Sequence, residues 1–285
     1  MGERHTVETT VGKLAVRVEG DGPAAVLWPS LFMDERSFDR LLPFLTPHRR
    51  VVVITGPGHG ASGDPGRRYS LADCAIAAGQ ILDRLTIREA VDWVGNAWGG
   101  HVGLLFAADR PTQCRSLVML GTPVAALSRA ERRRTYLLLA VYRLLGPVEM
   151  VVSGVTDVLL SAHTRAHDPE AVGLVQTGLR QADRRMLSNA VRSISLDREG
   201  TTGLLHEITV PVLTVTGRDH AGFTPAQAEA AARLLRHGQS AVVSDAAYLV
   251  PLEAPEVTAT LIRDFWARLA ADRPEGEPGE ITFEV

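Results

Sequence analysis

The chain has 285 residues, of which 45% are apolar and 22% are charged, and its formal net charge is -3. This length fits one large α/β domain with an insertion, and the composition is ordinary for a globular protein. The slight acidic excess argues against nucleic acid or an anionic membrane as a partner. Two cysteines provide neither a disulfide framework nor a zinc-binding spacing, so we expect free thiols, no metal site and no cofactor.

The first twelve residues lack the apolar core of a signal peptide, and no apolar run approaches the roughly 18 residues that span a membrane. We therefore expect a cytoplasmic protein whose partner is a small molecule. The frequent use of Ala, Arg, Leu and Val is associated with GC-rich bacterial genomes, so we expect a bacterial source.

The first half of the chain alternates predicted strands and helices. Residues 5–10 and 13–18 favour a hairpin that turns at Gly12. Short apolar runs without polar alternation predict strands that are buried on both faces, at 24–28, 51–54, 90–94 and 114–120. Helices are expected between them, at 34–45, 71–85 and 98–109. Ser70 is the predicted N-cap of the second of these helices.

The alternation stops after the strand at 114–120. From about residue 125 to 207 the apolar spacing is helical throughout, with helices predicted at 129–145, 148–160, 168–179 and 183–194. Ser128 and Glu131 have the spacing of a capping box at the first of them. A connection of this length inside a β/α series predicts an inserted helical cap.

The β/α series resumes with strands predicted at 210–215 and 241–243 and helices at 225–235 and 255–271. The predicted organisation is therefore a core domain of residues 1–124 and 208–272 and a cap, or lid, of residues 125–207. Residues 273–285 contain Pro, Gly and four Glu, which predicts a flexible acidic tail.

The segment Gly95-Asn96-Ala97-Trp98-Gly99 connects the strand at 90–94 to the helix at 98–109. Glycines on both sides of a tight turn indicate that side chains there would collide with the neighbouring backbone. This frame resembles the nucleophile elbow, G-x-S-x-G, of the α/β-hydrolase family. Other phrases of that family follow in its order: Gly58-x-Gly60-x-Ser62, Gly121-Thr122-Pro123, the turn at Gly217, and Leu252-Glu253-Ala254-Pro255-Glu256.

The resemblance covers residues 5–271 and implies the α/β-hydrolase fold, a mostly parallel twisted sheet flanked by helices with an inserted cap. It also identifies three catalytic positions. Ala97 takes the place of the nucleophile and has no lone pair, so no acyl-enzyme can form there. Tyr248 takes the place of the histidine. His220 takes the place of the acid, with Asp219 one residue earlier, and both residues remain candidates for that position.

A tyrosine, whose ordinary pKa is about 10, is a poor base at pH 7 but a good hydrogen-bond donor. The resemblance further implies an oxyanion hole made by the backbone N–H groups of Leu31 and Trp98. The neighbouring residues Ser30, Phe32 and Asn96 are expected near the C-terminal ends of the strands, where open α/β sheets bind ligands.

Three hypotheses follow from this degenerate triad. The first is a non-hydrolytic enzyme, in which Tyr248 is the acid and His220 or Asp219 the base. It would catalyse cyclisation, elimination, rearrangement or C–C bond chemistry, as a cyclase or lyase does, on a small apolar, polyketide-like metabolite of bacterial natural product biosynthesis. The second is an ester hydrolase whose nucleophilic serine is replaced by Ala97. The third is a catalytically dead pseudo-enzyme that binds a small ligand.

Overall fold

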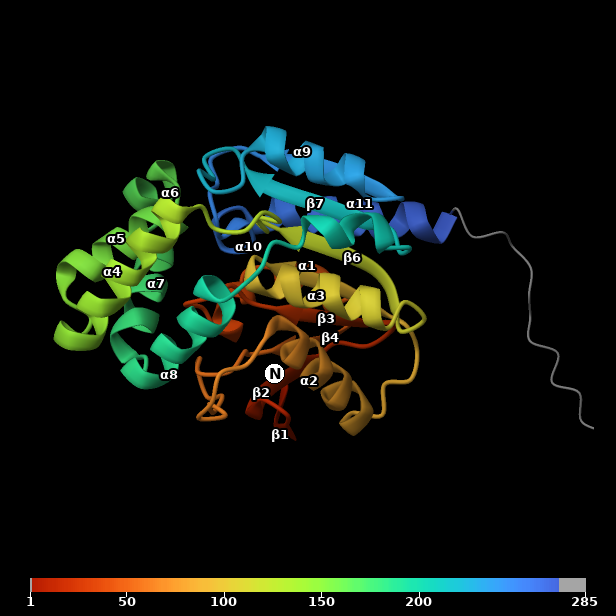
Figure 1. Ribbon diagram of the computed structural model, residues 1–285. Helices are drawn as coiled ribbons and strands as arrows, with labels where there is room; N and C mark the ends of the chain where they lie inside the picture. The colour runs from red at the N-terminus through yellow and green to blue at the C-terminus, as the bar shows by residue number, and fades with distance from the viewer. Residues whose placement is uncertain (1, 272–285) are drawn as a thin grey trace, which may run out of the picture.

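The computed structural model describes residues 2–271 (Figure 1). They contain an eight-stranded sheet in the order β1-β2-β4-β3-β5-β6-β7-β8. The first two strands form the antiparallel hairpin that the sequence predicts, and the six strands from β3 to β8 run parallel to one another. The strands are β1 (Glu3–Thr9), β2 (Gly12–Glu19), β3 (Ala24–Trp28), β4 (Arg50–Ile54), β5 (Val91–Asn96), β6 (Cys114–Leu120), β7 (Val212–Gly217) and β8 (Gly238–Val243).

Helices cover both faces of the sheet, because successive side chains of a buried strand point to opposite faces. Trp28 and Trp93 pack into one apolar cluster, while Leu27 and Val94, their neighbours in the chain, pack into the other. The first cluster lies under α2 (Leu71–Arg84), α3 (Trp98–Asp109) and α9 (Pro225–Leu234), and the second under α1 (Leu42–Leu45) and α11 (Pro255–Ala271).

All described elements between β6 and β7 are helical, and Figure 1 shows α4 to α8 grouped at one end of the sheet. Apolar residues of α4, α5, α7 and α8 form a third cluster, which also takes in Met33, Leu249 and Leu252. These elements are α4 (Arg129–Leu145), α5 (Glu149–Leu159), α6 (Ala162–His167), α7 (Pro169–Gln181), α8 (Arg184–Ala190), the π-helical turn η2 (Val191–Leu196) and the 3-10 helix η3 (Thr202–Glu207).

The prediction of one helix over 34–45 is wrong. The structure has a 3-10 turn, η1 (Glu35–Phe38), followed by the separate short helix α1. Pro43 explains the break, because a proline is favourable in the first turn of a helix but disrupts its interior. Two short helices, α6 and α10 (Val250–Glu253), were not predicted, since four to six residues are too few to show a helical period.

The predicted acidic tail, 273–285, lies outside the described residues. Among residues 2–271, no helix is both long enough and apolar enough to cross a membrane. The N-cap predicted at Ser70 and the capping box predicted at Ser128 are both confirmed, and Ser70 also forms a capping box with Asp73.

Ser70→Ala is expected to lower the free energy of unfolding by about 1 kcal/mol. The Oγ of Ser70 accepts a hydrogen bond from the amide of Asp73 at 3.1 Å, and the Asp73 carboxylate accepts one from the amide of Ser70 at 2.8 Å. Urea denaturation measures the loss. Ser240→Ala, an exposed serine in β8, serves as the control and should change little. Equal losses in both variants would show that the capping box contributes nothing.

Candidate active site

The turn from β5 to α3 holds Ala97 in an unusual backbone conformation, with φ 46° and ψ −95°. The amide of Ala97 donates to the carbonyl of Leu120 at 2.7 Å, which ties the turn to the end of β6. A Cβ atom placed on Gly95 would lie 2.1 Å from the backbone of Gly99, and one on Gly99 would lie 1.9 Å from the carbonyl oxygen of Trp28. Only glycine fits at both places, and the turn has the geometry of a nucleophile elbow with a methyl group at its tip.

Two backbone N–H groups are available next to this turn. Trp28 of β3 and Gly95 of β5 are paired in the sheet. Leu31 follows Trp28 by three residues, and Trp98 follows Gly95 by three, so both lie beyond the same edge of the sheet. Among the hydrogen bonds formed within residues 2–271, neither amide acts as a donor. The predicted oxyanion hole needs such donors, which have no other partner.

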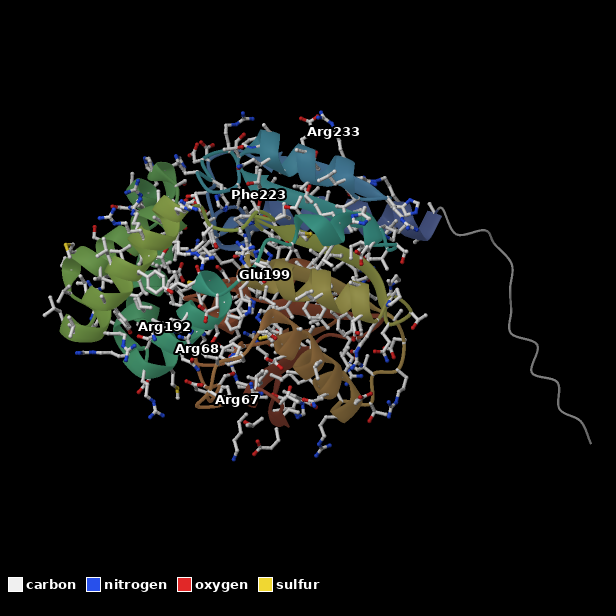
Figure 2. All side chains as sticks on the ribbon, viewed as in Figure 1. Arg67, Arg68, Arg192, Glu199, Phe223 and Arg233 are labelled. Atoms are coloured by element: carbon white, nitrogen blue, oxygen red, sulfur yellow. The ribbon has the colours of Figure 1, made fainter. Side chains whose placement is uncertain are left out.

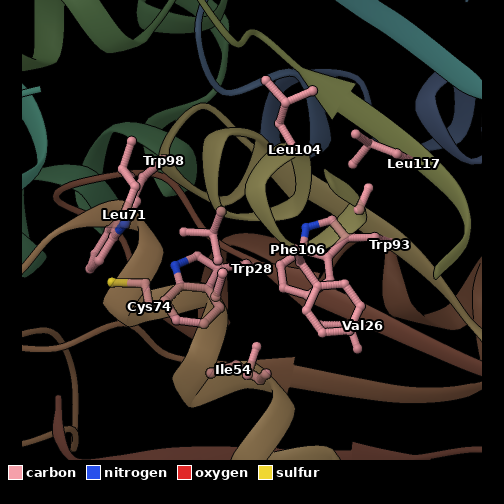
Figure 3. Packing of buried hydrophobic residues seen from close by; sticks show 14 of the residues in the cluster. Val26, Trp28, Ile54, Leu71, Cys74, Trp93, Trp98, Leu104, Phe106 and Leu117 are labelled. Carbon is pink, nitrogen blue, oxygen red and sulfur yellow. The ribbon is translucent and has the colours of Figure 1, made fainter. Parts of the chain in front are cut away.

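The side chain of Trp98 belongs to the core, in contrast to its amide. It is 2% exposed and packs edge-on against Trp28, with the ring centroids 5.7 Å apart. Figure 3 shows its ring close to Leu71 and Cys74. Trp98 can therefore contribute only its backbone amide to the predicted oxyanion hole.

A buried histidine holds the loop that carries the other donor. The amide of Phe32, a residue with φ 73°, donates to Nε2 of His59 at 3.0 Å. Nδ1 of His59 lies 2.9 Å from the carbonyl of Pro57 and donates to it, since Nε2 is the acceptor. Burial lowers the pKa of His59, which keeps the ring neutral and this pair of hydrogen bonds intact.

His220 is buried, with 3% of its surface exposed, and its ring lies against Tyr248 with the centroids 4.6 Å apart. Its Nδ1 accepts hydrogen bonds from the amides of Gly222 and Phe223, at 3.1 and 3.0 Å. Burial lowers the pKa of His220 to about 4. The neutral ring therefore carries its proton on Nε2, which has no partner among the described residues.

This tautomer makes His220 a hydrogen-bond donor, so the geometry does not favour the base role considered for it. Asp219 is unsuited for a different reason. Its side chain is exposed to solvent, whereas that of His220 points inward. Of the two candidates for the acid position, His220 is the one inside the site.

Tyr248 is half-buried, and burial raises the pKa of its phenol, against the opposing influence of Arg198 and Ser30. Its backbone carbonyl accepts a hydrogen bond from Nδ2 of Asn96 at 3.0 Å, and the same nitrogen donates to Leu120 at 2.9 Å. Asn96 therefore ties the segment of Tyr248 to the elbow. Ser30 is fully buried, and its side chain lies close enough to the phenol of Tyr248 to influence its pKa.

Two residues of the site were missed by sequence reasoning. Arg198 is 8% exposed, and its guanidinium donates to the carbonyls of Ala125 at 2.9 Å and Glu199 at 3.3 Å. No carboxylate pairs with it among the ion pairs of the described chain. His101 is buried, and its pKa is lowered well below the usual value, first by burial and then by Arg198. His101 follows Ala97 by one helical turn, a spacing that could have revealed it.

The segments next to the elbow thus bring several hydrogen-bond donors and one buried cation to the same end of the sheet. The donors are the amides of Leu31 and Trp98, the phenol of Tyr248 and Nε2 of His220. Donors that are fixed in place before a reaction are the kind of groups that stabilise negative charge on a substrate oxygen.

Stability is expected to depend on pH through His220. Because its pKa falls from 6.5 to about 4 on folding, the unfolded chain binds more protons between these values. The contribution of neutral His220 to the free energy of unfolding is complete above pH 6.5. It is lost as the pH falls toward 4, which lowers the free energy of unfolding by up to about 3 kcal/mol. Urea denaturation of the wild type and His220→Gln from pH 4 to 8 isolates this contribution from those of the other histidines. Parallel pH curves for the two proteins would contradict the assignment.

Known proteins resemble this chain in sequence and in structure. The family model of the alpha/beta hydrolase fold matches residues 26–144. A 2-hydroxy-6-oxononadienedioate/2-hydroxy-6-oxononatrienedioate hydrolase of Cupriavidus pinatubonensis is 30% identical over 229 residues, which are 75% of this chain and 73% of that protein. A 2-hydroxy-6-oxo-2,4-heptadienoate hydrolase of Pseudomonas putida is 32% identical over 120 residues, or 42% of this chain and 41% of the relative.

The solved structure of a thermophilic esterase from Thermogutta terrifontis superimposes with a TM-score of 0.86. The two chains are 22% identical, and the match covers 94% of this chain and 99% of the esterase. This likeness concerns the fold. The two relatives above are enzymes named as hydrolases. Because the match covers nearly three quarters of the relative from Cupriavidus pinatubonensis, the comparisons show that the chain belongs to the alpha/beta hydrolase fold family.

Proposed function

We propose that the protein is a non-hydrolytic enzyme of this family, which performs acid/base chemistry on a small carbonyl compound without a covalent intermediate. The observation that carries the proposal is the methyl group of Ala97 at the tip of an otherwise intact elbow. Serine at this position would attack the substrate, whereas alanine cannot, and the same backbone donors remain in place. Cyclisation, elimination, rearrangement or C–C bond chemistry of an apolar, polyketide-like metabolite is compatible with this site.

The roles of the residues follow from their protonation. The amides of Leu31 and Trp98 would hold the carbonyl oxygen as it becomes an enolate. Tyr248, whose pKa is raised, stays neutral at pH 7 and can donate a proton or a hydrogen bond. Arg198 supplies a positive charge that no carboxylate among the described residues neutralises. Its charge would favour the enolate over the neutral ketone, which is the difference that lowers a barrier.

His101 is the proposed proton acceptor, because its Nδ1 is buried without a partner among residues 2–271. The free protein holds the pKa of His101 low, partly through Arg198. An anionic group that binds beside Arg198 would offset that charge and raise the pKa of His101 toward the range of an effective base. The named substrates of the two relatives carry an oxo group and a carboxylate. We therefore prefer a keto acid, whose carboxylate would pair with Arg198, over a fully apolar metabolite.

The test uses 2-hydroxy-6-oxo-2,4-heptadienoate, the compound in the name of one relative. We expect the protein to accelerate loss of its dienol absorbance by tautomerisation, and NMR should show the carbon skeleton uncleaved. Tyr248→Phe should slow this step by about 100-fold, in the range of one general acid or oxyanion donor. Tyr142→Phe, which removes another buried phenol in the cap, should not.

Cleavage of the skeleton by the wild type would instead favour a hydrolase, the function that the names of the relatives favour. Saturable binding with no change in the compound would favour a ligand-binding pseudo-enzyme. Equal rates for Tyr248→Phe and Tyr142→Phe would remove the assigned role of Tyr248.

A further inference from the structure

Four arginine side chains surround one small pocket where the cap meets the loop that precedes α2. The pocket has a volume of about 210 Å³. It lies apart from the elbow, and none of the candidate site residues described above lines it. Its lining residues are Asp64, Gly66, Arg68, Arg143, Arg185, Ser188, Asn189 and Arg192.

These arginines come from four different elements. Arg68 lies in the loop, Arg143 near the end of α4, Arg185 in α8 and Arg192 in η2. Figure 2 shows Arg68 and Arg192 close together on the face where η2 approaches the loop. Side chains so far apart in the chain converge here only because the cap folds against the core.

The positive charge of the pocket is poorly balanced by the protein itself. Asp64 is the one carboxylate in the lining, and it accepts a hydrogen bond from Asn189 at 2.9 Å. Arg68 pairs with Asp197 at 2.8 Å, and both side chains are about half exposed. Arg143, Arg185 and Arg192 belong to no ion pair among those of the described residues. This concentration of charge stands out because the whole chain has a net charge of -3.

Two polar atoms of the lining residues are also buried without a partner within residues 2–271. They are Nε of Arg192 and Oγ of Ser188. Buried polar groups in native proteins nearly always have a hydrogen-bond partner, and both of these groups can donate. An anion in the pocket would supply the missing acceptors.

The local backbone is unusual as well. Arg192 lies in the π-helical turn η2, which continues α8. Single π-helical turns are rare and occur frequently at functional sites, because the widened turn changes the direction of its side chains.

We propose that this pocket binds a phosphate or diphosphate group of a small-molecule ligand. Guanidinium groups match phosphate oxygens with paired hydrogen bonds, and several of them together suit an anion with more than one charge. Pockets that hold whole drug-sized ligands measure roughly 300–1,000 Å³. The smaller volume here fits the charged group of a ligand whose remainder lies outside.

A bound phosphate would also join the cap to the core. Polar contacts already cross this boundary, among them those from Asn189 to Asp64 and from Arg68 to Asp197. An anion shared by Arg68 and the three arginines of the cap would add to them and relieve the repulsion between the guanidinium groups. This site does not depend on the reaction proposed at the elbow, and its test requires no turnover.

The experiment is isothermal titration calorimetry of the full chain with inorganic phosphate, diphosphate and phenyl phosphate, at constant ionic strength, with acetate as the singly charged control. We expect saturable binding at one site, tighter for diphosphate than for phosphate, and at most weak binding of acetate. Phenyl phosphate distinguishes the two possible sources of the phosphate group, a phosphate ester and a free anion. If it binds as well as phosphate, the site accepts phosphate esters, whereas its exclusion would limit the site to the free anions.

Arg192→Gln and Arg185→Gln should each weaken diphosphate binding by at least about tenfold. Arg133→Gln is the matched control, since it removes the same charge from an exposed position of α4 outside the pocket. It should change the affinity less than about twofold. Arg185 is exposed, so Arg185→Gln is expected to fold and still tests the proposal if Arg192→Gln impairs folding. Absence of saturable binding, or equal weakening by Arg133→Gln, would overturn the proposal.

Discussion

Ala97→Ser alone is expected to leave the protein without measurable hydrolysis of p-nitrophenyl acetate. The residue that takes the place of the histidine is Tyr248, and a neutral phenol is a poor base at pH 7. Burial raises the pKa of this phenol, so it stays neutral at that pH. His220 cannot substitute as the base, because its Nδ1 is occupied by two backbone amides. Activity of this single variant at the level of a serine esterase would contradict the proposed function.

Restoring three positions together is expected to have a large effect. In the variant with Ala97→Ser, Tyr248→His and His220→Asp, the new histidine and aspartate would stand where two rings now lie 4.6 Å apart. Members of a triad act as a unit, so their contributions appear only when all are present. We expect at least about a 1,000-fold gain over Ala97→Ser in hydrolysis of p-nitrophenyl acetate.

The double variant with Tyr248→His and His220→Asp is the control, because it has the new base and acid but keeps Ala97 and so has no nucleophile. Equal rates for the double and triple variants would mean that the elbow no longer presents a side chain to a substrate. That result would also remove the basis for placing a substrate next to Ala97.

Asp92→Ala is expected to lower the free energy of unfolding by about 3 kcal/mol. The carboxylate of Asp92 is buried near the start of β5, where it accepts from Nε of Arg49 at 3.1 Å, Nε of Arg115 at 3.0 Å and Oγ of Ser116 at 2.7 Å. Removing it leaves two guanidinium groups, each about a fifth exposed, without their partner. We place the loss at the lower end of the range for broken buried pairs because of that exposure.

Urea denaturation measures this loss, and Asp39→Ala is the comparison. Asp39 pairs with Arg17 but is about half exposed, so its removal should cost less than about 1 kcal/mol. If the two variants lose similar free energies of unfolding, burial does not strengthen the ion pairs of Asp92.

The elbow and the sheet could be predicted from the sequence because their determinants are local. Gly95 and Gly99 are required by contacts of the turn with its nearest neighbours, and this requirement leaves a short pattern in the chain. The central strands are buried on both faces, so they appear as uninterrupted apolar runs. Capping boxes at Ser70 and Ser128 are similarly confined to one helical turn.

Only the tertiary structure decided what surrounds the elbow. The choice between Asp219 and His220 depended on which side chain turns inward, and the tautomer of His220 depended on amides beyond it in the loop. Arg198 reaches the site from the end of the cap, about one hundred residues after Ala97. The four arginines of the pocket between the cap and the loop before α2 likewise carry no pattern in the sequence. Burial and charge pairing are properties of groups brought together by folding, and the amino-acid order specifies them only through the whole fold.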